Sequence, residues 1–107
     1  MKSLTATVAA ITLAGMATAT TAVAADGKRV YSNACIACHG NGVAGSPKVG
    51  DKEAWADRVT KDMATLYKHA IEGFQGEDGV MPAKGGYTNL SDDEVRAAVD
   101  YMVQESQ

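Results

Sequence analysis

Cysteine is scarce in this sequence of 107 residues, which has two cysteines, at positions 35 and 38. A structural zinc site is disfavoured, because zinc needs four ligands and the chain offers only these two thiols, His39 and the distant His69. A disulfide between the two cysteines would close a loop so short that it would stabilise the fold little. The two thiols are therefore better explained by another chemistry.

An excess of basic residues is also missing. Ten Lys and Arg residues stand against 13 Asp and Glu residues, which gives a formal net charge of −3. Nucleic-acid binding needs a basic surface, so the composition argues against it. After Asp26 the chain has no internal repeat, no low-complexity tract and no second domain boundary, and no segment alternates apolar and polar residues as a strand would. We therefore expect one small all-α domain.

The N-terminal segment has the composition of a secretory signal peptide. Lys2 is followed by an uncharged run from Ser3 to Ala25 that ends in small residues before Asp26. The run is long enough to be an uncleaved membrane anchor, but its many threonines and alanines make it only weakly apolar. The sequence predicts that residues 1–25 are removed by cleavage after Ala24 or Ala25, which places the mature domain, residues 26–107, in the periplasm.

A domain this short builds a marginal core on its own and usually needs a metal or cofactor to stabilise it. The segment Cys35-Ile36-Ala37-Cys38-His39 supplies an attachment site. Two cysteines separated by two residues and followed by histidine form the attachment pattern of a covalently bound c-type haem. The two thiols can add across the vinyl groups of one porphyrin, and the adjacent imidazole can bind the iron as the proximal ligand.

A C-x-x-C pair can also be a thioredoxin-like redox dithiol. That chemistry needs a strand-helix-strand context, which the flanking residues do not supply. Export also suits haem attachment, because maturation requires reduced thiols outside the membrane before the pair can oxidise. We therefore expect one haem c attached through Cys35 and Cys38, with His39 on the iron.

Helical periodicity and capping residues predict about four short helices wrapped around the haem. The last is the clearest, because Ser91-Asp92-Asp93-Glu94 is a capping box and an apolar stripe follows it. Gly73 is expected to end the third helix. The first predicted helix runs from about 27 to 34, after Asp26, and the second is a short stretch after Asp51 that carries Ala54, Trp55 and Val59. The third runs from about 62 to 72 and has on one face Met63, Leu66, Tyr67, Ala70 and Ile71. The fourth follows Ser91, and its expected buried residues are Val95, Ala98, Val99, Met102 and Val103.

The haem iron of an electron carrier usually has a second axial ligand, from histidine or methionine. Met63 and Met102 lie on apolar helical stripes, where core packing explains them. Met81 lies in a glycine-rich segment and precedes Pro82, which favours an extended backbone that can point the thioether at the ring. His69 falls off the apolar face of its helix and is expected to face solvent. Met81 is therefore the predicted second ligand.

Several neighbouring residues are candidates for supporting roles. The turn Gly45-Ser46-Pro47 is close enough in sequence to offer a carbonyl to the second ring nitrogen of His39. Trp55, Arg58 or Lys48 could hydrogen-bond the haem propionates, although Trp55 is as readily explained as a core residue. The lysines that could border the haem and guide docking are Lys48, Lys52 and Lys84.

With these segments in order, the chain resembles the small bacterial class I c-type cytochromes, and among them the cytochrome c-five group. The specific stretches are Cys35-Ile36-Ala37-Cys38-His39, Gly42-Val43-Ala44-Gly45-Ser46-Pro47-Lys48, Gly50-Asp51-Lys52-Glu53-Ala54-Trp55, Met81-Pro82-Ala83-Lys84-Gly85-Gly86 and Leu90-Ser91-Asp92-Asp93-Glu94.

The resemblance implies thioether links at Cys35 and Cys38, axial ligation by His39 and Met81, and a hydrogen bond from His39 to the carbonyl of Pro47. It also implies that Gly27 and Tyr31 cross the terminal helix near Ala98 and Tyr101. Two features depart from the family pattern. The chain lacks the extra cysteine pair of some c-five relatives, and its segment from Phe74 to Val80 is longer and more acidic.

The expected function is electron transfer rather than catalysis. We expect a monomeric, soluble carrier in the periplasm that exchanges single electrons with donor and acceptor proteins, without nucleic-acid partners and without stable membrane insertion after cleavage. Two other interpretations stay open at this point. One is a haem enzyme or gas-binding protein with an open sixth position, and the other is a dedicated cytochrome subunit of a larger oxidoreductase.

Overall fold

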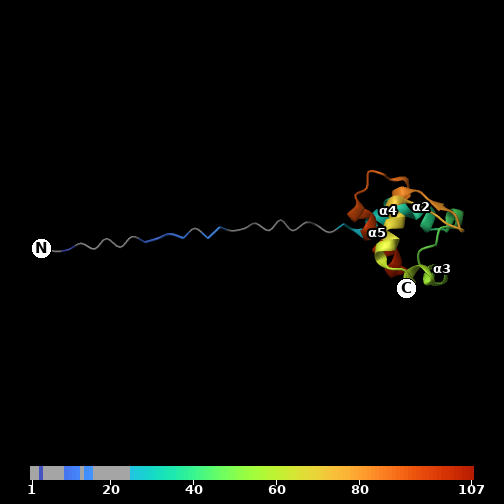
Figure 1. The fold of residues 1–107 in the computed structure, drawn as a ribbon, viewed down its shortest axis with the longest axis horizontal. Coiled ribbons are helices and arrows are strands. Elements are labelled where there is room, and N and C mark those ends of the chain that lie inside the picture. Colours follow the sequence, from blue (N-terminus) through green and yellow to red (C-terminus); the bar gives the residue numbers. More distant parts are fainter. Residues whose placement is uncertain (1–2, 4–8, 13, 16–24) are drawn as a thin grey trace.

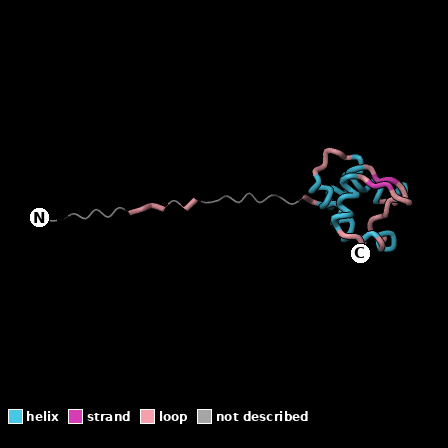
Figure 2. The backbone as a smooth tube through the Cα atoms, viewed as in Figure 1, coloured by secondary structure: helices cyan, strands magenta, loops and turns pink. Residues whose placement is uncertain are grey.

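The computed structural model describes residues 3, 9–12, 14–15 and 25–107 (Figure 1). Most of the predicted signal peptide, residues 1–25, therefore lies outside the described residues. Within the described residues, no helix combines the length and the hydropathy needed to cross a membrane. Residues 26–107 fold into a set of short helices around one apolar core, with a very small hairpin at one edge (Figures 1 and 2).

The first helix is continuous from Gly27 to His39 and carries the cysteine motif. It consists of α1 (Gly27–Val30), a π-helical turn η1 (Tyr31–Cys35) and α2 (Ile36–His39). The side chain of Asp26 caps its start by accepting from the Arg29 N–H, at 3.2 Å. The π-helical turn is marked by a hydrogen bond from the Ile36 N–H to the Tyr31 carbonyl. Such turns are often found at functional sites, and this one ends at Cys35, the first residue of the motif.

Two helices follow with the predicted caps. Helix α3 (Lys52–Ala56) begins at Asp51, whose carboxylate accepts from the Ala54 N–H, and η3 (Arg58–Thr60) continues it. Helix α4 (Met63–Glu72) begins at Asp62, and Gly73 ends it with a positive φ of 88°. A side chain at that φ is strained, which explains why glycine stands there. The predicted positions of both helices are confirmed.

The expectation that no strand forms is wrong in one place. Phe74–Gln75 (β1) and Val80–Met81 (β2) pair as an antiparallel hairpin, with Phe74 opposite Met81 (magenta in Figure 2). The turn is closed by the Gly76 N–H, which donates to the Gly79 carbonyl at 2.9 Å. Strands of two residues leave no periodic pattern in a sequence, so alternation could not reveal them. The all-α fold class itself is confirmed.

The C-terminal helix α5 (Asp92–Glu105) has the predicted capping box. The Glu94 N–H donates to the Ser91 hydroxyl, and the Ser91 N–H donates to the Glu94 carboxylate. The five positions predicted for its apolar stripe are all buried. Two short 3-10 turns, η2 (Val43–Gly45) and η4 (Ala83–Gly86), lie in the connecting loops.

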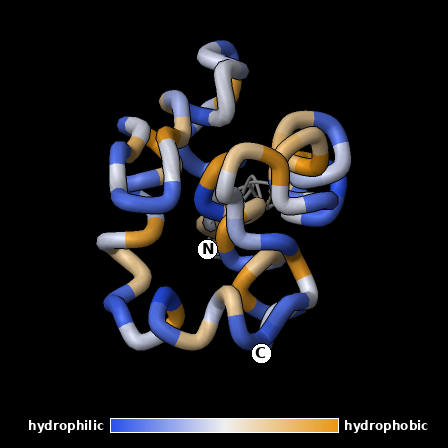
Figure 3. Tube along the Cα trace, turned by 90° about the vertical axis from the view of Figure 1, so that its right-hand side faces the viewer, coloured by the Kyte–Doolittle hydropathy of each residue, from blue (hydrophilic) through white to orange (hydrophobic). Residues whose placement is uncertain are grey.

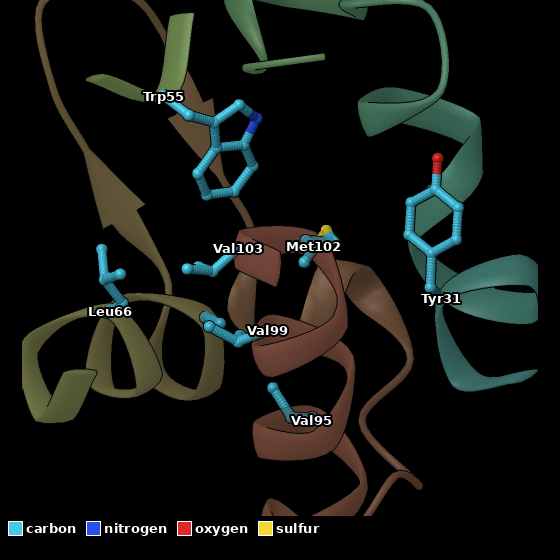
Figure 4. Close-up of a cluster of buried hydrophobic side chains, with 8 residues drawn as sticks. Tyr31, Trp55, Leu66, Val95, Val99, Met102 and Val103 are labelled. Atoms are coloured by element: carbon cyan, nitrogen blue, oxygen red, sulfur yellow. The ribbon is translucent and has the colours of Figure 1, made fainter. Parts of the chain in front are cut away.

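The core forms where α4, α5 and the first helix meet. Leu66 of α4 lies on one side of α5 and Tyr31 of the first helix lies on the other (Figure 4). Gly27 lies so close to α5 that an added Cβ would overlap the Ala97 carbonyl, and the rings of Tyr31 and Tyr101 are 5.3 Å apart. The predicted crossing of the first and last helices is therefore confirmed. Hydrophobic and hydrophilic stretches are interspersed along the trace of the domain (Figure 3).

Candidate functional site

A cavity of about 370 Å³ lies between α3, α4, α5, the loop 43–47 and the hairpin. This volume lies within the range of roughly 300–1,000 Å³ that is typical of ligand sites. Its wall is largely apolar, with a few polar groups. The lining residues are His39, Ala44, Gly45, Ser46, Pro47, Trp55, Asp57, Arg58, Lys61, Leu66, His69, Ala70, Phe74, Gly76, Glu77, Asp78, Gly79, Val80, Met81, Val99 and Met102.

His39 is held in one orientation at the wall of this cavity. The imidazole is 9 % exposed, and its Nδ1 lies 2.9 Å from the carbonyl oxygen of Pro47. A carbonyl can only accept a hydrogen bond, so Nδ1 carries the proton. The Nε2 lone pair is then free to bind a metal, which is the tautomer that a ligating histidine needs. The expected contact between His39 and Pro47 is confirmed.

The loop that holds His39 is itself fixed by Trp55. The Trp55 indole N–H donates to the carbonyl of Lys48 at 2.9 Å, and the Val49 N–H donates to the carbonyl of His39 at 2.8 Å. The indole is 4 % exposed, and its ring lies 6.3 Å from that of His39. The one donor of Trp55 is therefore already used by the Lys48 carbonyl, and its ring lies beside that of His39.

Met81 lies on the same cavity as His39. It stands on β2, is half-buried and packs against the core cluster. Met102 of α5 also lines the cavity, although it is 3 % exposed and forms part of the core. Two thioethers therefore reach the cavity wall, one from a loop-like hairpin and one from a packed helix.

The two cysteines lie on the helix that ends at His39, and neither is among the residues that line the cavity. Neither is in a disulfide; Cys35 is half-buried and Cys38 is exposed. Burial raises the pKa of the Cys35 thiol, and the neighbouring Cys38 raises it further. A redox dithiol of the thioredoxin type needs a lowered thiol pKa, so this environment disfavours that interpretation.

Comparisons with known proteins agree with this geometry. A family model described as cytochrome c oxidase, cbb3-type, subunit III, matches residues 22–102. The cytochrome c-555 of Chlorobaculum tepidum is 51 % identical over 83 residues, which cover 78 % of this chain and 77 % of the relative. The cytochrome c5 of Ectopseudomonas mendocina is 39 % identical over 75 residues, which cover 68 % of this chain and 82 % of the relative.

The chain belongs to the small class I cytochromes c.

A solved structure extends the likeness to the fold. The cytochrome c in a crystal structure of an electron transfer complex with nitrite reductase is 38 % identical, with a TM-score of 0.68, and the match covers 77 % of this chain and 95 % of that one. The predicted family and fold are therefore confirmed. The relatives of this chain are cytochromes c that carry electrons. Like them, this cytochrome has a covalently attached haem c.

The donor set of the cytochrome fits that group. An apolar cavity suits a large apolar ring, and two free thiols stand on the same helix as His39. His39 presents an unprotonated Nε2, and a thioether is available on the same cavity.

The expectation that His69 faces solvent is wrong. His69 is half-buried, lines the cavity and stacks on Phe74 with ring centroids 4.1 Å apart. The helical wheel of α4 placed it off the apolar face, but Phe74 folds back from the hairpin and covers it. A contact made by the next element is not visible in the periodicity of a single helix.

Two other basic side chains are engaged elsewhere in the cytochrome. Lys84 donates to the Leu90 carbonyl at 2.6 Å and pairs with Asp92 at 3.0 Å, so it does not offer a free charge for docking. Arg58 donates to the Ala54 carbonyl and pairs with Asp78 at 3.1 Å. Both residues line the cavity. Sequence reasoning missed this pair because its two members are 20 positions apart in the chain. The acidic character of the segment 74–80 was the available signal.

Proposed function

We propose that this cytochrome is a soluble, monomeric periplasmic carrier that passes single electrons between redox proteins, with His39 and Met81 as the axial ligands of its haem. Cys35 and Cys38 would form the thioether links. The observation that carries the proposal is the orientation of His39, whose Nδ1 proton is held by Pro47 and whose Nε2 is left free, on the cavity that Met81 also lines.

Bound haem supplies an iron that cycles between the ferric and ferrous states. The protein contributes the rest. His39 is oriented by Pro47, the apolar wall keeps water from the ring, and the thioether favours the ferrous state and so raises the potential. With both axial positions filled by side chains, no substrate needs to bind the metal. A weak, brief encounter with each partner is then sufficient, as is common for small redox interfaces.

The test compares two methionines of the same cavity. Met81→Leu and Met102→Leu each replace a thioether by a side chain of similar volume. We expect Met81→Leu to abolish the sulfur-to-iron charge-transfer absorption of the ferric protein and to lower its potential. Met102→Leu should keep the band, because its side chain is buried in the core. Loss of the band in Met102→Leu with its survival in Met81→Leu would contradict the ligand assignment.

A second candidate is a dedicated subunit of a larger oxidoreductase. The matching family model is described as a subunit of a cytochrome c oxidase, and the solved relative is in a complex with nitrite reductase. Copurification from the periplasm discriminates the two, because a free carrier elutes alone at the size of one chain. Rapid binding of carbon monoxide to the ferrous protein at neutral pH would instead favour a gas-binding protein with an open sixth position.

A further inference from the structure

The turn of the hairpin lies directly against the loop that precedes Pro47. At Gly45, where φ is 81°, an added Cβ would overlap the carbonyl of Asp78. At Gly79, an added Cβ would lie 2.5 Å from the carbonyl oxygen of Ala44. Each glycine therefore faces a backbone carbonyl of the other segment at a distance that a side chain would forbid. The two backbones are in mutual contact.

A charged contact holds the same turn from a third element. Arg58 donates through Nη1 to the carbonyl of Ala54 and pairs through Nη2 with the Asp78 carboxylate at 3.1 Å. The arginine is thereby tied both to the end of α3 and to the hairpin. Its side chain is 31 % exposed and that of Asp78 is 74 % exposed, so the pair is weak and sensitive to salt.

This contact joins the two segments that carry the axial ligands of the proposed function. On one side, the loop continues from Gly45 to Pro47, whose carbonyl holds His39. On the other side, the turn continues from Gly79 to Met81 on β2. All of these residues line the cavity. A displacement of the turn away from the loop would therefore move Met81 relative to His39.

We propose that this contact is a latch in which Gly45, Asp78 and Arg58 position Met81 and set how readily an external ligand replaces it. The proposal rests on ligation by Met81. In the exchange the thioether of Met81 leaves with its lone pair and the nitrogen lone pair of imidazole takes its place, with no transfer of electrons or protons. When the latch opens, the thioether of Met81 leaves more frequently.

Imidazole binding to the ferric holoprotein tests the charged part of the latch. Asp78→Ala removes the partner of Arg58, whereas Glu72→Ala removes one negative charge from an exposed residue of α4 that does not line the cavity and makes no ion pair within residues 25–107. We expect Asp78→Ala to raise the imidazole affinity and the exchange rate about two- to five-fold, as loss of one exposed pair allows. Glu72→Ala should match the wild type, and in about 1 M salt the difference should shrink.

A pair of glycine variants tests the backbone part. Gly45→Ala and Gly50→Ala carry a similar conformational penalty, since φ is 81° and 89° respectively. Only Gly45 faces a neighbour, whereas an added Cβ at Gly50 meets nothing within 4 Å. We expect Gly45→Ala to bind imidazole more tightly than Gly50→Ala and to weaken the charge-transfer band. If Gly45→Ala does not mature, the comparison of Asp78→Ala with Glu72→Ala decides.

Failure of the latch and failure of the proposed function give different results. If the wild type has the charge-transfer band but Asp78→Ala and Glu72→Ala bind imidazole equally, the latch is refuted and ligation by Met81 stands. If the wild type lacks the band and binds imidazole as tightly as Met81→Leu, the ligand assignment is refuted and the latch with it.

Discussion

At the scale of single residues, the buried hydroxyl of Ser106 makes a hydrogen bond whose contribution to stability can be measured. Ser106 is 2 % exposed, and its hydroxyl accepts from the Gly50 N–H at 3.0 Å, which ties the C-terminus to the loop before α3. We expect Ser106→Ala to lower the free energy of unfolding by about 1 kcal/mol, since one net hydrogen bond is lost. Denaturant unfolding of the holoprotein measures it.

Ser32→Ala is the matched control for this residue. Its hydroxyl is exposed and donates to the Lys28 carbonyl within the same helix. Water can replace that contact, so the expected change is within about 0.5 kcal/mol. Equal effects of the two substitutions would mean that the tie between Ser106 and Gly50 contributes nothing to stability.

At the scale of elements, the capping box of α5 makes stability depend on pH. Hydrogen bonds from the backbone and side chain of Ser91 hold the pKa of Glu94 below its ordinary value of 4.5. A carboxyl whose pKa is lowered by folding contributes stability above its unfolded pKa and loses it as the pH falls through the folded pKa. We therefore expect the wild type to lose stability below about pH 4.5 more steeply than Glu94→Gln.

Denaturant titrations at several pH values measure how steeply the free energy of unfolding falls with pH. Glu105→Gln, at the opposite end of α5, is the control. Glu105→Gln should retain the steep slope of the wild type. An identical slope in the wild type and Glu94→Gln would show that the capping box does not couple the helix to pH.

At the scale of the whole molecule, the domain depends on its cofactor. The cavity borders the apolar core and shares Trp55, Leu66, Ala70, Val99 and Met102 with it, so these side chains lose a packing partner when haem is absent. A domain of this size has little other apolar surface to bury. We expect the variant with Cys35→Ala and Cys38→Ala to be largely unfolded when made without haem.

Circular dichroism and limited proteolysis of that double variant test the dependence, with the holoprotein as the reference. Low helix content and rapid cleavage are expected. A folded, protease-resistant apoprotein would instead mean that the helices pack without the ring, and that the core cluster alone stabilises the domain.

The sequence by itself determined the helices and the motif, because both depend on short-range contacts. Asp26, Asp51, Asp62 and Ser91 each cap a helix by accepting from an N–H three residues ahead, so composition at the start of each segment was sufficient to locate it. The cysteine pair and His39 were likewise recognisable from spacing alone, and the Pro47 contact from the family resemblance.

Only the tertiary structure decided the contacts between segments far apart in the chain. The pairing of Arg58 with Asp78, the stacking of His69 on Phe74 and the two-residue strands follow from how the hairpin folds over the cavity. No local propensity encodes such contacts, since they depend on the packing of whole elements against one another. For the same reason, the sequence named Met81 as a ligand candidate, whereas the fold placed it on the same cavity as His39.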